Sequence, residues 1–590
     1  MGKTFAEKIL GAKTGSIVFK KPDIILSHDN TSSIKATFNK MGGDKVSDPN
    51  QILIVLDHNA PPTNAKLAND YHKIREIASY QGIKKFHDVG KGICHQIMSQ
   101  YAKPNMIIVG SDSHTCTAGA FNAFAAGIDR TETAGLWKQG ETWFRVPESI
   151  KITFTGKLQK GVYAKDIALW IIGLIGSDGA DYMSIEYHGE GVKSLSISDR
   201  MTIANLASEM GAKNAVFPAD EVLHAFLGVK TEGTWADADA IYKKQYNIDL
   251  SSIFPVVAAP HHVDNVKAVS EVQGTKLQQA LIGTCTNGRI EDIRIAAEII
   301  SGKQIPKDFQ LLVIPASQEI YLQAMEEGLV TSLIKAGANF LSPSCGPCLG
   351  TGQGIPADGF KVISTANRNF IGRMGNEKAE IYLASPATVA YSALAGEITD
   401  PRGIKANDVF PSSKEQSHTV VVEKGENRCE QNTWNYANVD NLNTDQMFAG
   451  NLTYNVNSNE ADKIMPHLFK GFDDSFADKV KKDDILMAGW NFGCGSSREH
   501  PSVGLAYAGI KAVIVKSVNR IFYRSSVNQG LPIIVVPEAI DFYKQGDKVD
   551  INFVKGEISI NDKKFAFAPL PEKLMAIFNK KGLINYVKEA

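Results

Sequence analysis

Short runs of apolar residues recur along the chain, and each run ends abruptly in polar or glycine-rich sequence. The runs are QILIVL, NMIIVG, QQALIG, LLVIP, KVISTAN and DILMAG. Stretches with the periodicity of helices lie between them, for example at 290–302 and at 317–337. Short apolar runs that alternate with helices are typical of α/β layers. We therefore predict an α/β fold built on largely parallel sheets.

Chemically reactive side chains stand directly after many of these runs. In chain order they include Asp57 with His58, Asp112 with Ser113 and His114, Cys285, Arg368, and Asn491. Ligands of open parallel sheets bind beyond the carboxyl ends of the strands. The pattern therefore predicts one shared site, although it does not say which strand ends meet there.

The composition changes between residues 397 and 445, where polar residues, Asn, Ser and Pro replace the apolar runs. Such sequence is typical of a surface linker. We predict a first region over residues 1–400, a linker over 401–445 and a separate, smaller domain over 446–590.

Composition and charge exclude several classes of protein. The 590 residues carry 63 Lys and Arg against 64 acids, a net charge of −1, which gives no support for a nucleic-acid or anionic-membrane partner. No apolar run approaches the roughly 18–20 residues of a membrane span, and the N-terminus does not resemble a signal peptide. Seven cysteines are too few for a secreted disulfide scaffold. We expect a cytoplasmic protein with metal-binding or buried thiols.

The segment SPSCGPCLG places Cys345 and Cys348 three residues apart, and Cys285 follows another strand-like run. A lone CxxC is a buried or redox pair about as often as it is a metal site. A redox motif should open a helix, however, and here the glycine-rich LGTGQG follows. The absence of a second CxxC excludes a four-cysteine zinc ribbon. Three thiolates can hold an iron–sulfur cubane and leave one iron open as a Lewis acid. Ordinary roles are expected for the other thiols, which are Cys94, Cys116, Cys429 and Cys494.

Three other motifs carry candidate chemistry. NFGCGSSREH is either a glycine-rich turn with a surface arginine or an anion-binding loop in which a serine alkoxide is stabilised. NRNFIGR places two arginines in one loop, where they are either solvated or suited to bidentate carboxylate binding. The DH and DSH pairs are either structural or general acids oriented by carboxylates.

Taken together, these stretches resemble the aconitase superfamily of aconitase, homoaconitase and 3-isopropylmalate dehydratase. The matching segments are LDHN, GICHQ, GSDSHT, ANLASEMGA, IGTCTNGRIEDI, SPSCGPCLG, NRNFIGR and NFGCGSSREH, in the family's order over residues 28 to 530. The resemblance implies three α/β domains around a [4Fe–4S] cluster and a C-terminal swivelling domain, here fused through the linker. It implies a hydro-lyase that moves a hydroxyl between adjacent carbons of a hydroxy-carboxylic acid.

The resemblance also implies roles for individual residues. Cys285, Cys345 and Cys348 would hold the cluster and leave one iron without a protein ligand, and Asn205 and Asn367 would support it. Ser496 would be the alkoxide base beside Arg498, and the other catalytic positions would be Asp57, His58, His95, Asp112, His114 and Glu209. The substrate carboxylates would be bound by His28, Ser113, Arg368, Arg373 and Ser497.

One departure from the aconitase pattern bears on the substrate. No arginine occurs between Arg428 and Arg498, where aconitases carry a substrate-binding one. In isopropylmalate and homoaconitate enzymes, the short loop after a motif similar to IMP selects the side arm of the substrate. The corresponding loop here is His467–Lys470, so Lys470 is a candidate substrate ligand. We expect a substrate of the 3-isopropylmalate or homoaconitate type, with citrate, as in aconitate hydratase, as the alternative. An aconitase-like iron-sensing RNA binder is the alternative from another class, and the oligomeric state, including a monomer, is left open.

Overall fold

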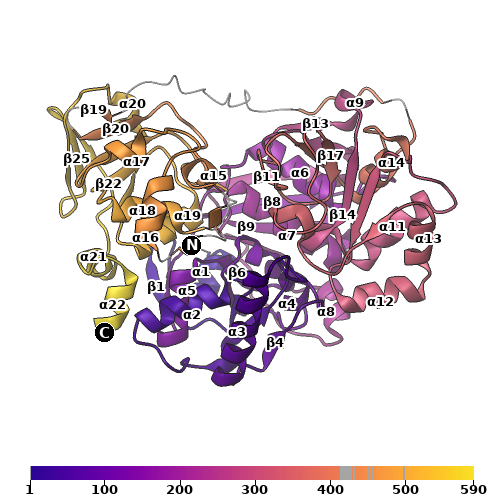
Figure 1. Cartoon of the computed structure of the whole chain (residues 1–590), viewed down its shortest axis with the longest axis horizontal. Helices are drawn as coiled ribbons and strands as arrows, with labels where there is room; N and C mark the ends of the chain where they lie inside the picture. Colours follow the sequence, from indigo (N-terminus) through magenta and orange to yellow (C-terminus); the bar gives the residue numbers. More distant parts are fainter. Residues whose placement is uncertain are drawn as a thin grey trace.

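The computed structural model describes residues 2–404, 406–411, 428–429, 432–449, 452–453, 456–458, 460–495 and 498–589. Ser496 and Ser497, to which the sequence assigns catalysis and substrate binding, lie outside the described residues. The chain forms several sheet-centred units, with the C-terminal one beside the others (Figure 1).

The N-terminal unit is a five-stranded parallel sheet in the order β4-β3-β2-β5-β6. Its strands are β2 (Ile24–Ser27), β3 (Ile52–Val55), β4 (Lys85–His87), β5 (Ile107–Gly110) and β6 (Phe124–Gly127). Both faces are buried because alternate residues enter two separate cores: Ile52 and Ile54 on one side, Leu53 and Val55 on the other. This explains why the strand appears in the sequence as a continuous apolar run.

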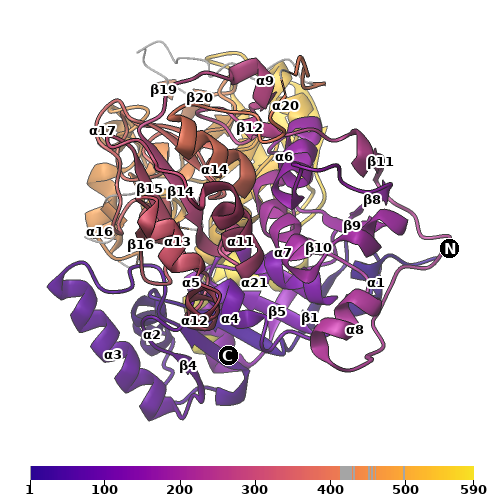
Figure 2. The same ribbon diagram turned by 90° about the vertical axis from the view of Figure 1, so that its right-hand side faces the viewer.

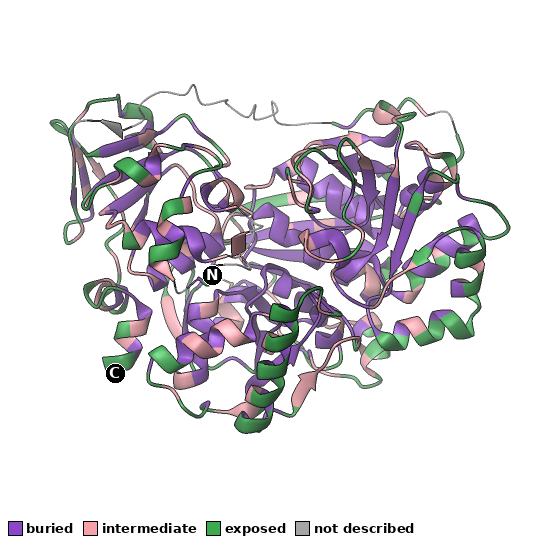
Figure 3. Cartoon of the chain, viewed as in Figure 1, coloured by how far each residue is buried: buried purple, intermediate pink, exposed green. Residues whose placement is uncertain are grey.

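Helices cover both faces of this sheet. They are α1 (Phe5–Leu10), α2 (Thr31–Lys40), α3 (Ala65–Gln81), α4 (Cys94–Met98) and α5 (Arg130–Gln139), and a small antiparallel pair joins β1 (Ile17–Lys20) to β7 (Thr142–Arg145). Strands β2, β3, β5 and β6 are buried and the edge strand β4 is half-buried, whereas α3 presents one exposed side (Figure 3).

The second unit has a four-stranded parallel sheet in the order β10-β9-β8-β11. Its strands are β8 (Ser149–Thr155), β9 (Ser184–His188), β10 (Asn214–Val216) and β11 (Lys244–Asp249), with helices α6 (Ala164–Ile175), α7 (Ile197–Leu206) and α8 (Glu221–Leu227). Helix α6 is apolar almost all round and is buried between this sheet and the next unit.

The third unit has a seven-stranded sheet in the order β13-β12-β18-β17-β14-β15-β16, in which β12 runs antiparallel to both of its neighbours and the other strands share one direction. The strands are β12 (Val256–Ala258), β13 (Val266–Ala268), β14 (Gln279–Gly283), β15 (Gln310–Ile314), β16 (Asn339–Phe340), β17 (Lys361–Ser364) and β18 (Glu380–Leu383). The helices are α9 (Val269–Val272), α10 (Thr284–Asn287), α11 (Ile290–Ile300), α12 (Gln318–Glu326), α13 (Leu329–Lys335) and α14 (Pro386–Ala395). Helices α11, α13 and α14 cover one face (Figure 2).

The expected apolar runs all form strands, and 290–302 forms α11. The stretch 317–337 was expected as one helical segment but forms two helices, α12 and α13. Gly328 between them has a φ of 72°, a left-handed conformation that ends the first helix.

The C-terminal unit has a five-stranded sheet, β19-β20-β21-β22-β23, in which only β19 runs antiparallel. Its strands are β19 (Arg428–Cys429), β20 (Thr433–Tyr436), β21 (Ile485–Ala488), β22 (Ala512–Val515) and β23 (Ile533–Val535). Strand β20 falls inside the predicted linker, so this sheet begins before residue 446. Trp434 and Tyr436 are fully buried and pack β20 into the core. Because polar residues surround them in the sequence, the apolar pattern did not predict this strand.

Helices and a small antiparallel sheet complete this unit. The helices are α15 (Thr444–Met447), α16 (Ala461–Ile464), α17 (Phe476–Lys479), α18 (His500–Tyr507), α19 (Arg520–Asn528), α20 (Pro537–Phe542), α21 (Glu572–Asn579) and α22 (Leu583–Glu589). The sheet pairs β24 (Val549–Asn552), β25 (Glu557–Ile560) and β26 (Lys563–Ala566). Among the described helices, none is long and apolar enough to cross a membrane.

The end of the chain packs back onto the N-terminal unit. Val527, Leu574, Leu583 and Val587 share one apolar core with residues of α1, α2 and α5. The C-terminal unit is therefore fixed against the first sheet through α19, α21 and α22, as the position of α22 beside α2 and α5 indicates (Figure 1).

Candidate active site

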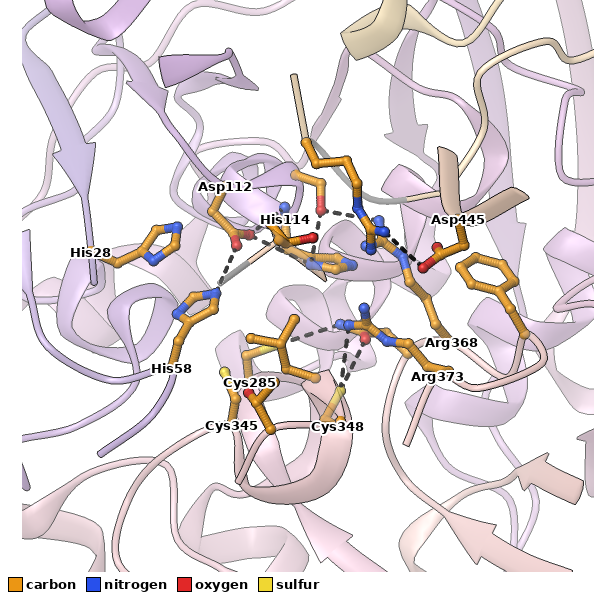
Figure 4. A pocket seen from close by; sticks show the side chains of 18 of the residues that line it. His28, His58, Asp112, His114, Cys285, Cys345, Cys348, Arg368, Arg373 and Asp445 are labelled. Atoms are coloured by element: carbon orange, nitrogen blue, oxygen red, sulfur yellow. Dashed lines mark hydrogen bonds and ion pairs between the residues drawn. The ribbon is translucent and has the colours of Figure 1, made fainter. Parts of the chain in front are cut away.

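A cavity of about 240 Å³ lies where the N-terminal, third and C-terminal units meet. It is lined by residues after β3 and β5, by the loops that carry Cys285, Cys345 and Cys348, by residues 367–377, and by Asp445, Ala449, Thr453 and Arg498 from the C-terminal unit. Most strand ends that the sequence marked as reactive therefore meet in one place (Figure 4), whereas Asn491, after β21, bonds Ser517 and Asn441 and does not line the cavity.

Asp112, directly after β5, is the centre of a histidine cluster. Its Oδ1 lies 2.8 Å from His95 Nε2 and accepts the backbone N–H of His114 at 2.7 Å. Its Oδ2 lies 3.3 Å from His58 Nε2. Burial by itself would raise the pKa of Asp112, but the charge of His95 and three histidine hydrogen bonds hold it well below its usual range. Asp112 is therefore an ionised acceptor shared by histidines.

A second chain of contacts runs from His114 to Arg368, an arginine that lines the cavity. His114 Nε2 lies 2.7 Å from Glu209 Oε1, and Arg368 Nε donates to both Glu209 oxygens at 3.0 and 2.9 Å. Arg368 Nη2 also donates to Ser113 Oγ at 3.0 Å. Burial raises the pKa of Glu209, but the Arg368 charge and His114 outweigh it and lower the pKa to about 2. Glu209, which does not itself line the cavity, thus fixes the side chains of His114 and Arg368.

His58 is held by Asp57 and by a neighbouring ring. His58 Nδ1 lies 2.7 Å from Asp57 Oδ1, and the His28 ring stacks on it with centroids 3.8 Å apart. Burial lowers the pKa of His58, but the Cys345 thiolate, Asp57 and Asp112 raise it well above its usual range. Burial and the His58 charge lower the pKa of His28 to about 3, so this ring is neutral.

Asp29 organises the backbone beneath this pair. It accepts the backbone N–H groups of Asp57, His58 and Asn59 and the hydroxyl of Tyr71. Asp57 in turn accepts the backbone N–H of Cys94 at 2.7 Å, at the start of α4. The backbone that carries His58 is thereby held by several hydrogen bonds to Asp29, which limits the movement of the side chain.

The three candidate ligand thiols open onto the same cavity. Cys285 follows β14, and Cys345 and Cys348 lie in the turn after β16. Asn205 Nδ2 and Asn367 Nδ2 donate to Cys285 Sγ at 3.4 and 3.5 Å, and Cys348 Sγ lies 3.6 Å from Asn367 Oδ1. The two asparagines that the sequence assigned to cluster support therefore contact sulfur.

The donor set suits a polynuclear cluster better than a single ion. Two histidine–carboxylate groups in the described part of the chain have all their ligand atoms within 4.8 Å of one another, but the three thiols do not form such a group. Zinc–sulfur bonds of about 2.3 Å would bring three sulfurs closer than that. Thr351 Oγ1 and Arg373 Nε, both lining the cavity, are buried without a hydrogen-bond partner among the described residues. The cavity thus offers soft ligands and free polar donors to a bound group.

The C-terminal unit contributes an arginine to this cavity. Arg498 Nη1 lies 2.9 Å from Asp445 Oδ1 and donates to the carbonyl of Phe448 at 2.9 Å. Lys470 is exposed and does not line the cavity. Leu468 and Phe469, in the same loop, are fully buried and pack into the C-terminal core with Tyr436 and Phe476. The loop thus directs its apolar residues away from the cavity, and the role of Lys470 stays a prediction.

Several residues near the site went unmarked in the sequence. Arg130 and Asp445 line the cavity, and Cys94, expected to be an ordinary thiol, also lines it. Arg520 of α19 donates to the Ser113 carbonyl at 2.9 Å and to Ser208 Oγ at 3.2 Å. Arg130 follows β6 beside Asp129, but that short, alanine-rich run is not among the apolar runs used in the sequence analysis. Asp445, Cys94 and Arg520 do not stand directly after a strand.

Comparison with known proteins agrees with this site. The model of the aconitase family (aconitate hydratase) matches residues 3–396, and that of the aconitase C-terminal domain matches residues 412–538. The 3-isopropylmalate dehydratase large subunit 1 of Methanopyrus kandleri is 46% identical over 415 residues, which are 68% of this chain and 99% of that one. The methanogen homoaconitase large subunit of Methanocaldococcus jannaschii is 44% identical over 419 residues, 67% of this chain and 99% of that one.

A solved structure, 3-isopropylmalate dehydratase (leuD) from Methanocaldococcus jannaschii, is 38% identical and covers 25% of this chain and 88% of its own, with a TM-score of 0.23. The fold is α/β, and its cavity brings thiols, histidines, carboxylates and arginines together. The chain belongs to the aconitase family. It is accordingly an aconitase-type hydro-lyase, and family membership implies an iron–sulfur cluster.

Proposed function

We propose that this chain is a [4Fe–4S]-dependent dehydratase and isomerase that moves a hydroxyl between adjacent carbons of a hydroxy-di- or tricarboxylic acid. The favoured substrate is of the 3-isopropylmalate or homoaconitate type. One observation carries the proposal: three thiols and a histidine–carboxylate network open onto the same cavity. The names of the relatives, 3-isopropylmalate dehydratase and homoaconitase large subunits, support the same class of substrate.

Cys285, Cys345 and Cys348 would hold the cluster, with Asn205 and Asn367 bonded to the sulfurs. When bound, the group supplies a Lewis-acidic iron without a protein ligand, which polarises the hydroxyl that leaves. The hydrogen bonds from the asparagines to Cys285 stabilise the thiolate form that ligation requires.

The histidine cluster would move the proton of the departing hydroxyl. Asp112 is ionised and shared by His58, His95 and His114, so a proton gained by one ring is stabilised by the same carboxylate. His58, with its raised pKa, is the proton donor of this group. Neutral His28, stacked on His58, adds no competing charge.

Arginines would bind the substrate carboxylates. Arg368 is fixed by Glu209 and reaches Ser113, while the unpartnered Nε of Arg373 is buried beside Cys348. Guanidinium groups suit planar carboxylates because they offer two parallel N–H donors. Ser496, beside Arg498, would take the proton from the adjacent carbon.

An apolar wall supports a substrate with an apolar side arm. Ile93, Leu349, Phe370 and Ile371 line the cavity, whereas Lys470 does not. Burial of each CH₂ of such an arm gains about 0.8 kcal/mol. The alternative is an aconitate hydratase that acts on citrate. The matching family model, which is described as aconitate hydratase, supports this alternative. A third carboxylate would then need a cation of this cavity such as Arg130.

The test is turnover of a panel of acids by anaerobically reconstituted protein. We expect kcat/KM to be at least about tenfold higher for isopropylmalate than for citrate, because the isopropyl arm buries about two further apolar carbons, at roughly 0.8 kcal/mol each, where citrate carries a charged carboxylate. Ile371→Ala should lower kcat/KM for isopropylmalate severalfold and leave citrate unchanged. Citrate as the best substrate would contradict the substrate assignment, and no turnover of any member would contradict the proposed reaction.

A further inference from the structure

Lys165 is a fully buried cation on α6, and none of the roles above uses it. Its side chain has no exposure, and its Nζ donates to the carbonyls of Thr365 at 2.9 Å and Ala366 at 2.6 Å. Helix α6 belongs to the second unit, whereas residues 365 and 366 follow β17 in the third. The lysine therefore bonds one unit to the strand end that carries Asn367 and Arg368.

No carboxylate balances this charge directly. Among the described residues, Lys165 forms no salt bridge, and the two groups to which its Nζ donates are neutral carbonyls. Burial lowers the pKa of Lys165 to about 7, while the sulfurs of Cys285 and Cys348 and the carboxylates of Glu209 and Asp292 act to raise it. Glu209 is bonded to Arg368, and Asp292 accepts from Asn287 and from the Arg289 backbone. An uncompensated buried cation costs several kcal/mol, so a counter-anion is expected close by.

Two of the candidate ligand thiols contact the residue that follows the carbonyls bonded by Lys165. Asn367, the next residue after Ala366, donates to Cys285 Sγ at 3.5 Å and lies 3.6 Å from Cys348 Sγ. Thr286, next to Cys285, donates to the same Thr365 carbonyl that accepts from Lys165, at 2.5 Å. Cys348 shares a core with the apolar residues of α6 that flank Lys165. One turn of backbone thus separates the ammonium group from two of the three ligands.

We propose that Lys165 is a positioning residue that supplies the counter-charge of the cysteine-held cluster and fixes the 365–367 turn that contacts it. This inference rests on the proposed cluster. Three thiolates around an iron–sulfur core form a net anion, and a buried cation beside it stabilises the loaded state. The same cation, without that anion, destabilises the cluster-free protein. Charge and hydrogen bonding can therefore be separated by experiment.

The test compares Lys165→Gln and Lys165→Met with the wild type, both cluster-loaded and cluster-free. Gln keeps a donor for the carbonyls without the charge, and Met removes both. We expect loss of iron to a chelator to be on the order of tenfold faster in both variants, because a charge interaction in a low-dielectric site is lost. The midpoint potential of the cluster should become more negative, and the unfolding temperature of cluster-free Lys165→Gln should equal or exceed that of the wild type.

Lys213→Met is the matched control. Lys213 is also fully buried, but it acts among Glu132, Arg520 and Arg524, away from the cysteines. Its replacement should leave iron retention and the midpoint potential unchanged. Wild-type iron retention and potential in Lys165→Gln would overturn the inference while leaving the dehydratase proposal intact. Equal destabilisation of the loaded and cluster-free forms would overturn it too, because it would show a purely structural lysine. A wild type that binds no cluster would overturn both proposals.

Discussion

At the scale of single residues, Asp112 is the group on which the proton chemistry depends most. One carboxylate accepts from three histidines, so its removal changes the orientation and charge of all of them. Asp112→Asn keeps the shape but replaces one acceptor oxygen by a donor. We expect kcat to fall by at least about 10²-fold, the scale of a positioned proton-transfer group, with iron content unchanged. Steady-state kinetics and iron analysis of the same sample would check this, and a near-normal kcat would contradict it.

The thiols offer a sharper test at the same scale. Cys345→Ser should abolish bound iron and dehydration together, and Cys285→Ser and Cys348→Ser should do the same. Cys116→Ser is the control, because Cys116 is buried away from the cavity and its Sγ donates to the Ala204 carbonyl at 3.2 Å, as a serine hydroxyl can. Full iron and sulfide in Cys345→Ser would remove that thiol from the ligand set.

The sequence predicted the site residues that follow strands, because a polar side chain after a buried strand is visible as a break in an apolar run. Asp112 and Cys285 were found in this way. The pairing of Glu209 with Arg368 joins residues 159 positions apart and is set by tertiary packing. The sequence did not predict Lys165 and Arg520 as buried residues near the site, because nothing in their neighbouring residues indicates a buried basic side chain. The loop His467–Lys470 was expected near the substrate, but the aromatic ring of Phe469 in this loop fills the C-terminal core.

At the scale of elements, the ends of parallel strands place the candidate site residues around one cavity. Arg498, just before α18, lines the same cavity. Sequence periodicity predicted these strands well because both sheet faces are buried. It failed at Gly328, where a single left-handed residue divides an otherwise continuous helical pattern. It also missed β20, whose buried Trp434 and Tyr436 stand in polar surroundings.

The loop before α18 carries a prediction of its own. Ser496→Ala should leave iron and substrate binding intact but lower kcat by at least about 10²-fold, since the base would be lost. Ser497→Ala should act chiefly on KM, as expected of a group that mainly binds. Kinetics of the two variants side by side would check this, and equal, small effects would show that the loop only shapes the cavity.

At the scale of the whole molecule, the C-terminal unit is bound to the N-terminal one by a buried polar contact. Arg524 of α19 donates to Glu132 of α5 and to the Trp143 carbonyl at 2.8 Å, and its guanidinium lies over the Trp143 ring. Asn528 Nδ2 donates to Asp129 at 2.6 Å. Because Arg520, on the same helix, reaches the Ser113 carbonyl, the docking of α19 also supports the cavity.

Arg524→Gln should therefore destabilise the protein and weaken the site. Leaving Glu132 buried and unpaired costs roughly 3–5 kcal/mol, which thermal or denaturant unfolding would measure. The exposed pair of Arg294 with Glu327 is the control, and Arg294→Gln should cost about 1 kcal/mol or less. Similar small losses in both variants would show that the contact between the units is weaker than its burial indicates.

The most direct test of the central claim is to measure iron, sulfide and dehydration rate on the same samples during graded anaerobic reconstitution. The account predicts that the rate with the favoured hydroxy-dicarboxylate rises in proportion to the cluster content, from nothing in the cluster-free protein. It predicts no rise at all in Cys345→Ser under the same treatment. Dehydration at full rate by cluster-free protein, or a rate that does not follow the iron and sulfide bound, would contradict it.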